Sequence, residues 1–296
     1  MTTYQDLVDE VAITLSGYTQ RQDQATYLTA AIGSTDLTFT VNDGTTLSRG
    51  MVEIGDELVW VDSFNQQTNT ATIPPYGRGF RGTTAAAHDY GVRVTIAPSF
   101  PRSVIASKVN DAIVGVYPDL WGSGWTEFPF IAVRTTYELP QEVIDAQQVS
   151  WQTIGPSKEW LPVRNFRMDL MASQTAFPSG KTVSVYDAIV PGRPVRVYYT
   201  KVPTALELMS DDFSDTGLPD SAKEVIVLGA AYRTMAYLDL GRIPAQSAEA
   251  DAMQSNDPVG TGGAASRLLF QLYQQRLAVE VRRQQEQFPA RVRITR

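Results

Sequence analysis

His88 is the only histidine of the chain and the first residue to consider as a catalytic group. A Ser-His-Asp arrangement needs a carboxylate that orients the histidine toward a serine, and Asp89 is the neighbouring acid. Adjacent residues of an extended segment point to opposite faces, so Asp89 is poorly placed to orient the His88 ring. We therefore expect His88 to make structural hydrogen bonds in a loop rather than to act as a base or metal ligand.

Two pairs of adjacent acids offer the carboxylates that glycoside hydrolysis uses, Asp56-Glu57 and Asp211-Asp212. Both pairs fall in turn-like sequence, where solvated acids stay ionised, so we expect structural roles for them. The run from Gly260 to Gly263 lacks the lysine of a phosphate-binding P-loop and follows no clear strand, and we interpret it as a hinge. The sequence thus assigns no catalytic, metal or cofactor site.

The segment LWGSGWTEFPF holds a third group of candidate residues, because it places Trp121, Trp125, Phe128 and Phe130 around two glycines. Aromatic side chains dominate both protein cores and interface anchors. The segment could therefore bind a carbohydrate or a protein partner, or it could pack beneath a turn between helix and sheet. We favour packing, and the other interpretation stays open.

The composition of the chain excludes several classes of protein. With 296 residues, of which 43% are hydrophobic, the chain can bury a sizeable core. The absence of cysteine excludes disulfides, zinc fingers and thiol nucleophiles. The opening MTTYQDLVDEV has no apolar signal region, and no segment approaches the ~18 consecutive apolar residues of a membrane span. We expect neither an export signal nor a membrane partner.

The net charge of −7 is distributed unevenly along the chain. Seven arginines stand against two glutamates from Arg267 to Arg296, which gives this stretch +5 and leaves −12 on the remainder. Six of these arginines are candidates for docking on a partner: Arg276, Arg282, Arg283, Arg291, Arg293 and Arg296. The alternative is a solvated helix face, which a charge run also fits.

Hydrophobic spacing predicts four helices and two blocks of strands. The first helix begins near Thr3 and ends at Gly17, and the third ends at Gly241, with Pro244 beyond. The predicted fold is α+β, a helical bundle core of about four helices with two inserted β-modules. The segments are a helical core (1–20, 99–118 and 219–288), a first β insert (25–98), a second β insert (127–205), which is a sandwich or curled sheet, and a basic tail (289–296).

The stretch from Ile73 to Ile96 carries the most specific pattern, GRGxxGTxxxxHxxG, between two strand-like runs. It resembles a β-module that recurs in tail, baseplate and head-tail joining proteins of bacteriophages. We expect Arg78, Arg81 and His88 to hold this loop in shape or to meet a neighbouring subunit.

The order of helices and β inserts resembles the head-tail adaptor proteins of tailed phages, also called connector or head-completion proteins. The resemblance rests on the opening helix, on the helix AKEVIVLGAAYRTMAYLDLGR and on the terminal helix with its basic tail. It implies a structural protein of the virion neck, made in the host cytoplasm. The family forms a ring of about a dozen copies, a dodecamer, around the DNA channel.

The resemblance also implies partners for this chain. They are further copies of itself, the portal protein, a downstream neck or tail protein, and double-stranded DNA that passes without sequence-specific binding. A tail-tip or baseplate component is the alternative, in which the β-module serves as an interaction platform. A virion enzyme that degrades glycan or cell wall is a remote alternative, supported only by the carboxylates and exposed aromatic residues.

Overall fold

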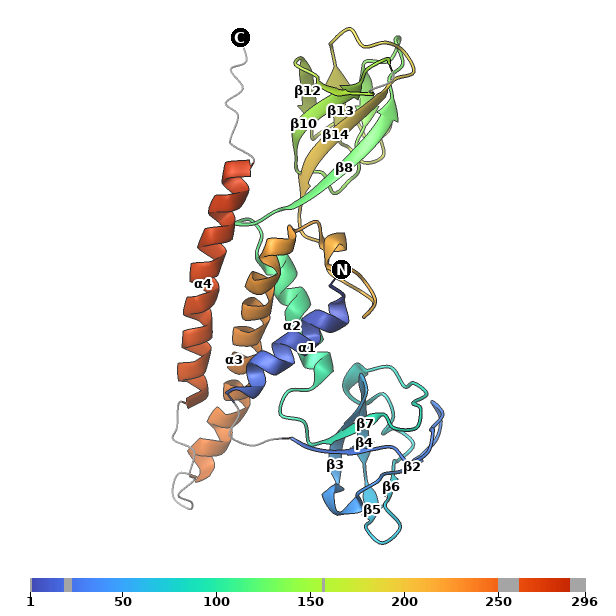
Figure 1. The fold of residues 1–296 in the computed structure, drawn as a ribbon, viewed down its shortest axis with the longest axis vertical. Coiled ribbons are helices and arrows are strands. Elements are labelled where there is room, and N and C mark those ends of the chain that lie inside the picture. The colour runs from blue at the N-terminus through green and yellow to red at the C-terminus, as the bar shows by residue number, and fades with distance from the viewer. Residues whose placement is uncertain (1, 19–22, 156–157, 250–260, 288–296) are drawn as a thin grey trace. The chain divides into compact units, whose positions relative to one another are not determined.

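The computed structural model describes residues 2–18, 23–155, 158–249 and 261–287. Within these residues the chain forms four α-helices and 14 β-strands, and the strands make four antiparallel sheets (Figure 1). The helices are α1 (Tyr4–Ser16), α2 (Arg102–Gly115), α3 (Lys223–Glu249) and α4 (Thr261–Gln287). Over the same described ranges, no helix is long and apolar enough to cross a membrane.

The first β-module follows α1 and consists of two small sheets. The larger sheet has the order β1-β7-β3-β4, formed by Gln24–Tyr27, Arg93–Ile96, Gly50–Ile54 and Glu57–Val61. The smaller sheet has the order β2-β6-β5, formed by Thr38–Thr40, Thr70–Thr72 and Ser63–Asn65. A two-residue turn, Gly55-Asp56, joins β3 to β4, and Ile54 pairs with Glu57 across it. Gly55 has a φ of 60°, the left-handed conformation that such turns require.

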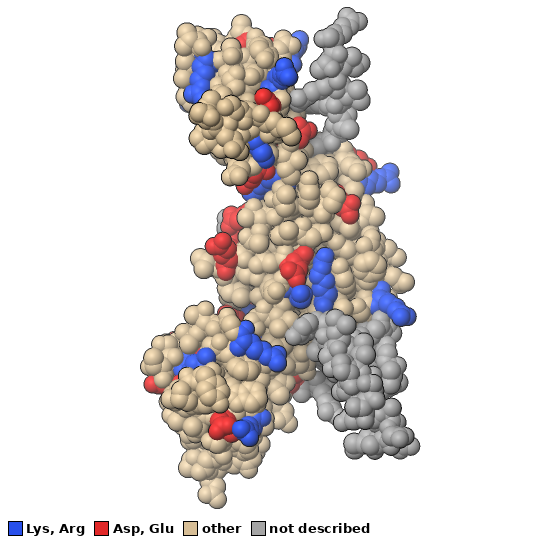
Figure 2. Space-filling model, turned by 180° about the vertical axis from the view of Figure 1, so that it is seen from behind, with Lys and Arg blue, Asp and Glu red and all other residues tan. Residues whose placement is uncertain are grey.

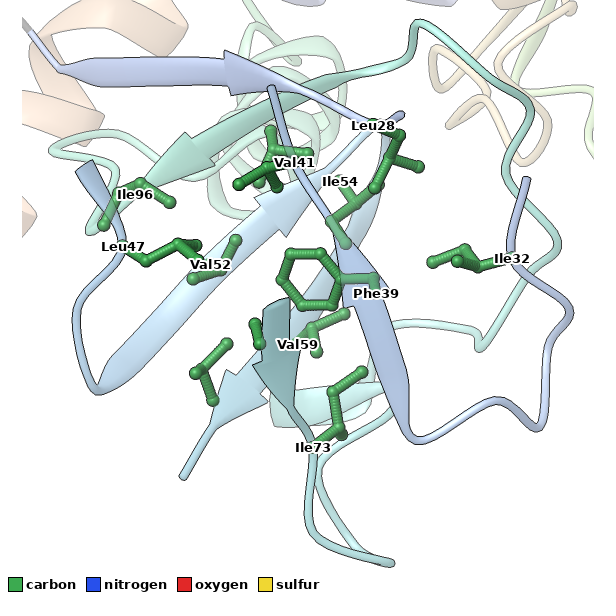
Figure 3. Close-up of a cluster of buried hydrophobic side chains, with 13 residues drawn as sticks. Leu28, Ile32, Phe39, Val41, Leu47, Val52, Ile54, Val59, Ile73 and Ile96 are labelled. Atoms are coloured by element: carbon green, nitrogen blue, oxygen red, sulfur yellow. The ribbon is translucent and has the colours of Figure 1, made fainter. Parts of the chain in front are cut away.

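Side chains from both sheets of the first module share one core. Phe39 of β2 lies at its centre in Figure 3 and is 2% exposed. Val52 and Ile54 of β3 and Val59 of β4 approach from the larger sheet (Figure 3). Alternate strand residues point to the same face, so the alternating pattern of the sequence accounts for this cluster.

The second β-module lies between α2 and α3 and also has two sheets. One has the order β11-β10-β14-β8, formed by Trp160–Pro162, Asp145–Gln152, Pro194–Lys201 and Gly122–Pro129. The other has the order β12-β13-β9, formed by Phe166–Asp169, Thr182–Val185 and Thr136–Glu138. Buried residues of both sheets, including Val149, Val183 and Val197, form a second core. The second module thus has two sheets that share one core.

The helices agree with the sequence in part. In α1 the apolar stripe of Leu7, Val8, Val11 and Leu15 is fully buried, as the spacing predicted. The predicted stop of the third helix at Gly241 is wrong, because α3 continues to Glu249. A helix tolerates an interior glycine at a cost of only about 1 kcal/mol, so Gly241 alone does not terminate it. Likewise α4 begins at Thr261, inside the stretch that we interpreted as a hinge.

The prediction of a helical bundle core is wrong, although the α+β class is right. Among the described residues, two hydrophobic clusters of 13 buried residues each lie inside the β-modules. Internal contacts divide the chain into two compact units, one of 1–4, 112–226 and 274–296 and the other of 5–111 and 227–273. The division cuts through α2, α3 and α4, so the helices do not form a unit of their own. Helical periodicity reveals an apolar stripe but not the element that covers it.

Candidate functional site

The GRGxxGT loop runs between β6 and β7 and contains Arg78, Arg81 and His88. Gly79 adopts a left-handed φ of 58°, and a Cβ atom there would lie 2.7 Å from the carbonyl oxygen of Thr83. Only glycine fits this position without a shift of the backbone. The backbone of His88 pairs with Ile32 in both directions, each bond measuring 2.9 Å. The loop is therefore tied to the segment that follows β1.

The side chain of Glu57 is the centre of this site, and it is only 1% exposed. It accepts hydrogen bonds from Arg78 Nε at 2.8 Å and from Arg78 Nη2 at 2.9 Å. The backbone nitrogen of Gly79 donates to Oε1 at 2.9 Å and that of Ala86 to Oε2 at 3.1 Å. His88 Nε2 lies 2.8 Å from Oε2. Five contacts thus satisfy one buried carboxylate.

Arg78 completes the site by binding three backbone carbonyls. Nη1 donates to the oxygens of Gly33 at 2.7 Å and Asp36 at 2.9 Å, and Nη2 donates to that of Ala86 at 2.6 Å. One guanidinium therefore joins the Gly33–Asp36 loop, β4 and the Ala86 segment. Arginine suits this task because its five donors are held in a fixed plane.

The chemistry of Glu57 follows from these contacts. Burial raises the pKa of a carboxyl, but the hydrogen bonds from Arg78, Gly79, His88 and Ala86 outweigh burial and lower the pKa of Glu57 to about 2. The group is ionised across the physiological range, so it cannot donate a proton as a general acid. The residue that orients His88 is Glu57, not Asp89, and our placement of Glu57 in a solvated turn is wrong.

Arg81 does not join this site. It lies in the short 3-10 segment Phe80–Gly82 with a φ of 55°, its guanidinium 5.8 Å from the ring of Phe80, and its side chain is exposed. The structure therefore brings two of the three predicted loop residues together. Whether Arg81 meets a neighbouring subunit stays a prediction.

Three of the six candidate docking arginines lie on α4 within the described residues. Arg276 Nε lies 2.7 Å from Glu224, and both Arg276 and Arg283 pair with Glu280, at 3.3 and 3.0 Å. Glu280 is 1% exposed and also accepts a hydrogen bond from Ser221 at 2.7 Å. Arg276 and Arg283 therefore stabilise a buried carboxylate of their own chain.

Arg282 is the most exposed of the three arginines, with 83% of its side chain accessible, and its contact is with Glu286 one turn away. Such a surface pair contributes little to stability, which leaves Arg282 able to bind elsewhere. Arg291, Arg293 and Arg296 lie outside the described residues. On the face shown in Figure 2, basic and acidic side chains of the described residues mostly stand near one another.

The four aromatic residues of LWGSGWTEFPF have different environments. Phe130 is buried in the second core and Phe128 packs against it, whereas Trp121 binds the side chain of Gln284 through its backbone. Trp125 is 57% exposed, and the guanidinium of Arg196 lies 4.5 Å from its ring. The same guanidinium lies 4.2 Å from the ring of Trp160. Packing therefore accounts for Phe128 and Phe130, hydrogen bonds to Gln284 hold the backbone of Trp121, and Trp125 remains accessible.

Sequence reasoning missed a second polar site, around Arg102 at the start of α2. Its backbone nitrogen donates to Glu53 Oε1 at 2.6 Å, Nε to Asp56 at 2.8 Å and Nη1 to Asp9. Glu53 and Arg102 line a cleft of about 320 Å³ together with Asp23 and Asp56. These acids are dispersed in the sequence, and only the fold brings them together.

The environment of Glu53 is opposite to that of Glu57. Burial raises the pKa of Glu53 to about 7, against the lowering influence of Arg102, while Asp56 and Asp23 raise it further. The described residues contain no group of three or more His, Cys, Asp or Glu side chains arranged to hold a metal ion.

Comparison with known proteins places the chain in a family. A family model described as SU10 adaptor protein, a phage adaptor family, matches residues 83–294. The match includes the second β-module and all of α2, α3 and α4, and begins within the GRGxxGT loop. No curated protein matches the chain. Because the matched region is well over half of the 296 residues, the chain belongs to the SU10 adaptor protein family of phage adaptors.

Proposed function

We propose that this protein is a structural component of the virion neck that forms a ring between the portal of the phage head and the tail. The observation that carries the proposal is the family match over residues 83–294. The ring would contain about a dozen copies and would continue the DNA channel. The portal, a downstream neck or tail protein and passing DNA are its partners.

The arginines at the end of the chain supply the proposed contact with the portal. Arginine binds carboxylates through two parallel bonds, which suits docking on an acidic surface. Arg282 and the three arginines beyond residue 288 carry most of this role, because Arg276 and Arg283 are already paired with Glu280. Arg276 and Arg283 support the docking by fixing the helix from which the tail emerges.

The acidic balance of the chain supports passage of DNA through such a ring. The net charge is −7, and outside the last 30 residues it is −12. A channel wall of this sign repels phosphates, so that DNA moves without binding. A ring whose inner wall proved strongly basic would count against this element of the proposal.

The loop with Arg78, Arg81 and His88 has a supporting role in the proposal. Arg78 and His88 give it a fixed shape through the buried Glu57 carboxylate. Arg81, with its exposed side chain, is available for a contact with an adjacent copy.

The second candidate function is a tail-tip or baseplate component. The pattern GRGxxGTxxxxHxxG keeps this function open, because it resembles modules from several positions in the virion. The two functions differ in their partner. An adaptor binds portal rings of its own virus, whereas a baseplate component does not.

Co-sedimentation with portal rings tests the proposal directly. We expect the full chain to sediment with the rings and a chain truncated after Phe288 to remain in the supernatant. Circular dichroism and thermal unfolding of the truncated chain provide the control, because both should match those of the full chain. Binding by the truncated chain would contradict the role of the arginine tail, and absence of binding by the full chain would favour the tail-tip function.

A further inference from the structure

Strand β8 forms one edge of the four-stranded sheet in the second β-module, where its strand neighbour among the described residues is β14 alone. At the start of this edge, the backbone nitrogen of Ser123 donates to the oxygen of Gly217 at 2.8 Å. Alternate residues of a strand direct their backbone groups to the same side, so Trp125 and Glu127 point to the same edge as Ser123. Within the part of the chain that the structure describes, the backbone nitrogens of Trp125 and Glu127 donate to no other residue. We call these two residues the β8 edge, and such an edge accepts a further strand.

The inner face of β8 is incompletely covered at this edge. Phe128 packs against the second core and yet remains half-buried, and Thr126 on the same face is also half-buried. A strand beside β8 that carried apolar side chains on this face would extend the cover of the core. Because side chains alternate between the two faces of a sheet, a segment that fits this edge alternates apolar and polar residues.

Two hydrogen bonds hold the end of α4 at the beginning of β8. The side chain of Gln284 accepts from the backbone nitrogen of Trp121 at 3.2 Å and donates to the Trp121 oxygen at 2.7 Å. Gln284 is 5% exposed, and Trp121 directly precedes Gly122, the first residue of β8. This part of α4 and the second β-module belong to the same compact unit. The helix ends at Gln287, so the chain leaves α4 three residues beyond this contact.

The residues that follow α4 match the β8 edge in pattern and in length. Residues 290–296 read ARVRITR, in which the β-branched Val292 and Ile294 alternate with arginines. This alternation is typical of a strand with one apolar face. At ~3.3 Å per residue, residues 288–296 can span about 30 Å, which exceeds the length of the eight-residue β8.

We propose that residues 290–296 add to the β8 edge of their own chain as a parallel fifth strand of the sheet. The direction is parallel because the segment begins beside the start of β8 and follows β8 along its length. In parallel strands, residues that share a face of the sheet direct their backbone groups to the same side. With Val292 and Ile294 on the inner face, their N–H groups therefore point toward β8, and the N–H group of Arg293 points away from it.

The occupant is a segment of the same chain because the Gln284–Trp121 contact keeps it close to β8 at a high effective concentration. Pairing of this kind covers an edge strand that would otherwise be a template for aggregation. The inference concerns the free protein and does not rest on the proposed ring. Docking of the same arginines on a portal would require the segment to leave β8.

Amide hydrogen exchange of the labelled protein, followed by NMR, tests this pairing. We expect the Trp125 and Glu127 amides to exchange about tenfold more slowly in the full chain than in a chain truncated after Phe288. The Thr126 amide faces β14 and should keep its rate in both chains, which makes it the internal control for folding. Equal rates for Trp125 and Glu127 in the two chains would overturn the proposal.

Two proline substitutions in the full chain make the test specific for a strand. Ile294→Pro removes an N–H group that points to β8, so it should raise the exchange rates of Trp125 and Glu127 to those of the truncated chain. Arg293→Pro is the matched control, because the N–H group that it removes points away from β8, and the slow exchange should persist. Equal effects of the two substitutions would contradict pairing as a strand.

A mixing experiment separates the segment of the same chain from that of a second copy. Labelled truncated chain is combined with an excess of unlabelled full chain, and the Trp125 and Glu127 amides of the labelled chain should keep their fast exchange. Slow exchange in the mixture would show that the segment of one copy covers β8 of another, and it would overturn the assignment. No sample contains a portal, so failure of this inference leaves the proposed function standing, and portal binding is scored separately by co-sedimentation.

Discussion

The guanidinium of Arg78 binds the buried carboxylate of Glu57 through two bonds, from Nε to Oε1 at 2.8 Å and from Nη2 to Oε2 at 2.9 Å. The two side chains are 6% and 1% exposed. The pair joins the arginine of the GRGxxGT pattern to the first residue of β4, and His88 contacts the same carboxylate. The most specific pattern of the sequence thus surrounds an acid that lies outside the pattern.

Replacing Glu57 with Gln should destabilise the first β-module strongly, because it leaves the buried Arg78 guanidinium without its counter-charge. Breaking a buried pair in this way costs about 3–5 kcal/mol of unfolding free energy. Asp62→Asn is the control, since the Arg49–Asp62 pair is 69% and 49% exposed and should contribute less than ~1 kcal/mol. Urea unfolding measures both, and equal losses would show that the buried pair has no special role.

The pH dependence of Glu57 has a defined sign. Its pKa is lowered to about 2 in the folded chain from 4.5, so its contribution to stability is present above pH 4.5 and is lost as the pH falls toward 2. We expect Glu57→Gln to be less stable than the original chain at pH 6 and to approach it near pH 2. A constant difference across this range would contradict the assignment.

Glu53 should show the opposite dependence. Its pKa is raised from 4.5 to about 7, so its contribution is present below pH 4.5 and is lost as the pH rises through 7. Glu53→Gln keeps an oxygen that accepts from the Arg102 nitrogen but cannot ionise. We expect it to gain up to ~3 kcal/mol relative to the original chain between pH 4.5 and pH 8, measured by urea unfolding. A gain that is independent of pH would refute this account.

Two glycines of the GRGxxGT loop form a matched pair. Gly79 and Gly82 have φ values of 58° and 84°, but a Cβ atom meets the Thr83 oxygen at 2.7 Å only at Gly79, and open space at Gly82. Gly82→Ala should cost about 1 kcal/mol through φ alone, and Gly79→Ala should cost ~1–2 kcal/mol more through the added clash. Thermal unfolding compares them, and the reverse order would contradict the loop geometry.

Substitutions of two arginines on α4 should affect folding stability and portal binding differently. Arg276→Gln removes a partner of the buried Glu280 and of the exposed Glu224, and it should lower the unfolding free energy, whereas Arg282→Gln should leave it within about 0.5 kcal/mol. If Arg282 docks on the portal, Arg282→Gln should weaken co-sedimentation with portal rings. Unchanged co-sedimentation would remove Arg282 from the docking set.

Local sequence signals predicted the elements better than their assembly. The spacing of Leu7, Val8 and Val11 predicted α1, and the Gly55-Asp56 turn was visible as a break between strand-like runs. The sequence could not exclude a helical bundle core, because either another helix or a sheet can cover the apolar stripe of a helix. Which of them covers it depends on contacts far apart in the sequence.

The buried acids show the same limit. Glu57 looked like a turn residue, and its burial follows from the β3–β4 register and from a guanidinium 21 positions later. Glu280 offered a signal that could have been used, because Arg276 and Arg283 stand four positions before it and three after it on a helix. The Arg102 site had no such signal, since Asp9, Glu53 and Asp56 come from separate elements.

The mass of the complex between this protein and portal rings of the same virus shows whether the protein forms a ring on the portal. Sedimentation velocity or light scattering of the mixture gives the number of copies bound to each ring. We expect about a dozen copies per portal, one for each portal subunit. Rings that keep their own mass in the presence of excess protein would contradict it.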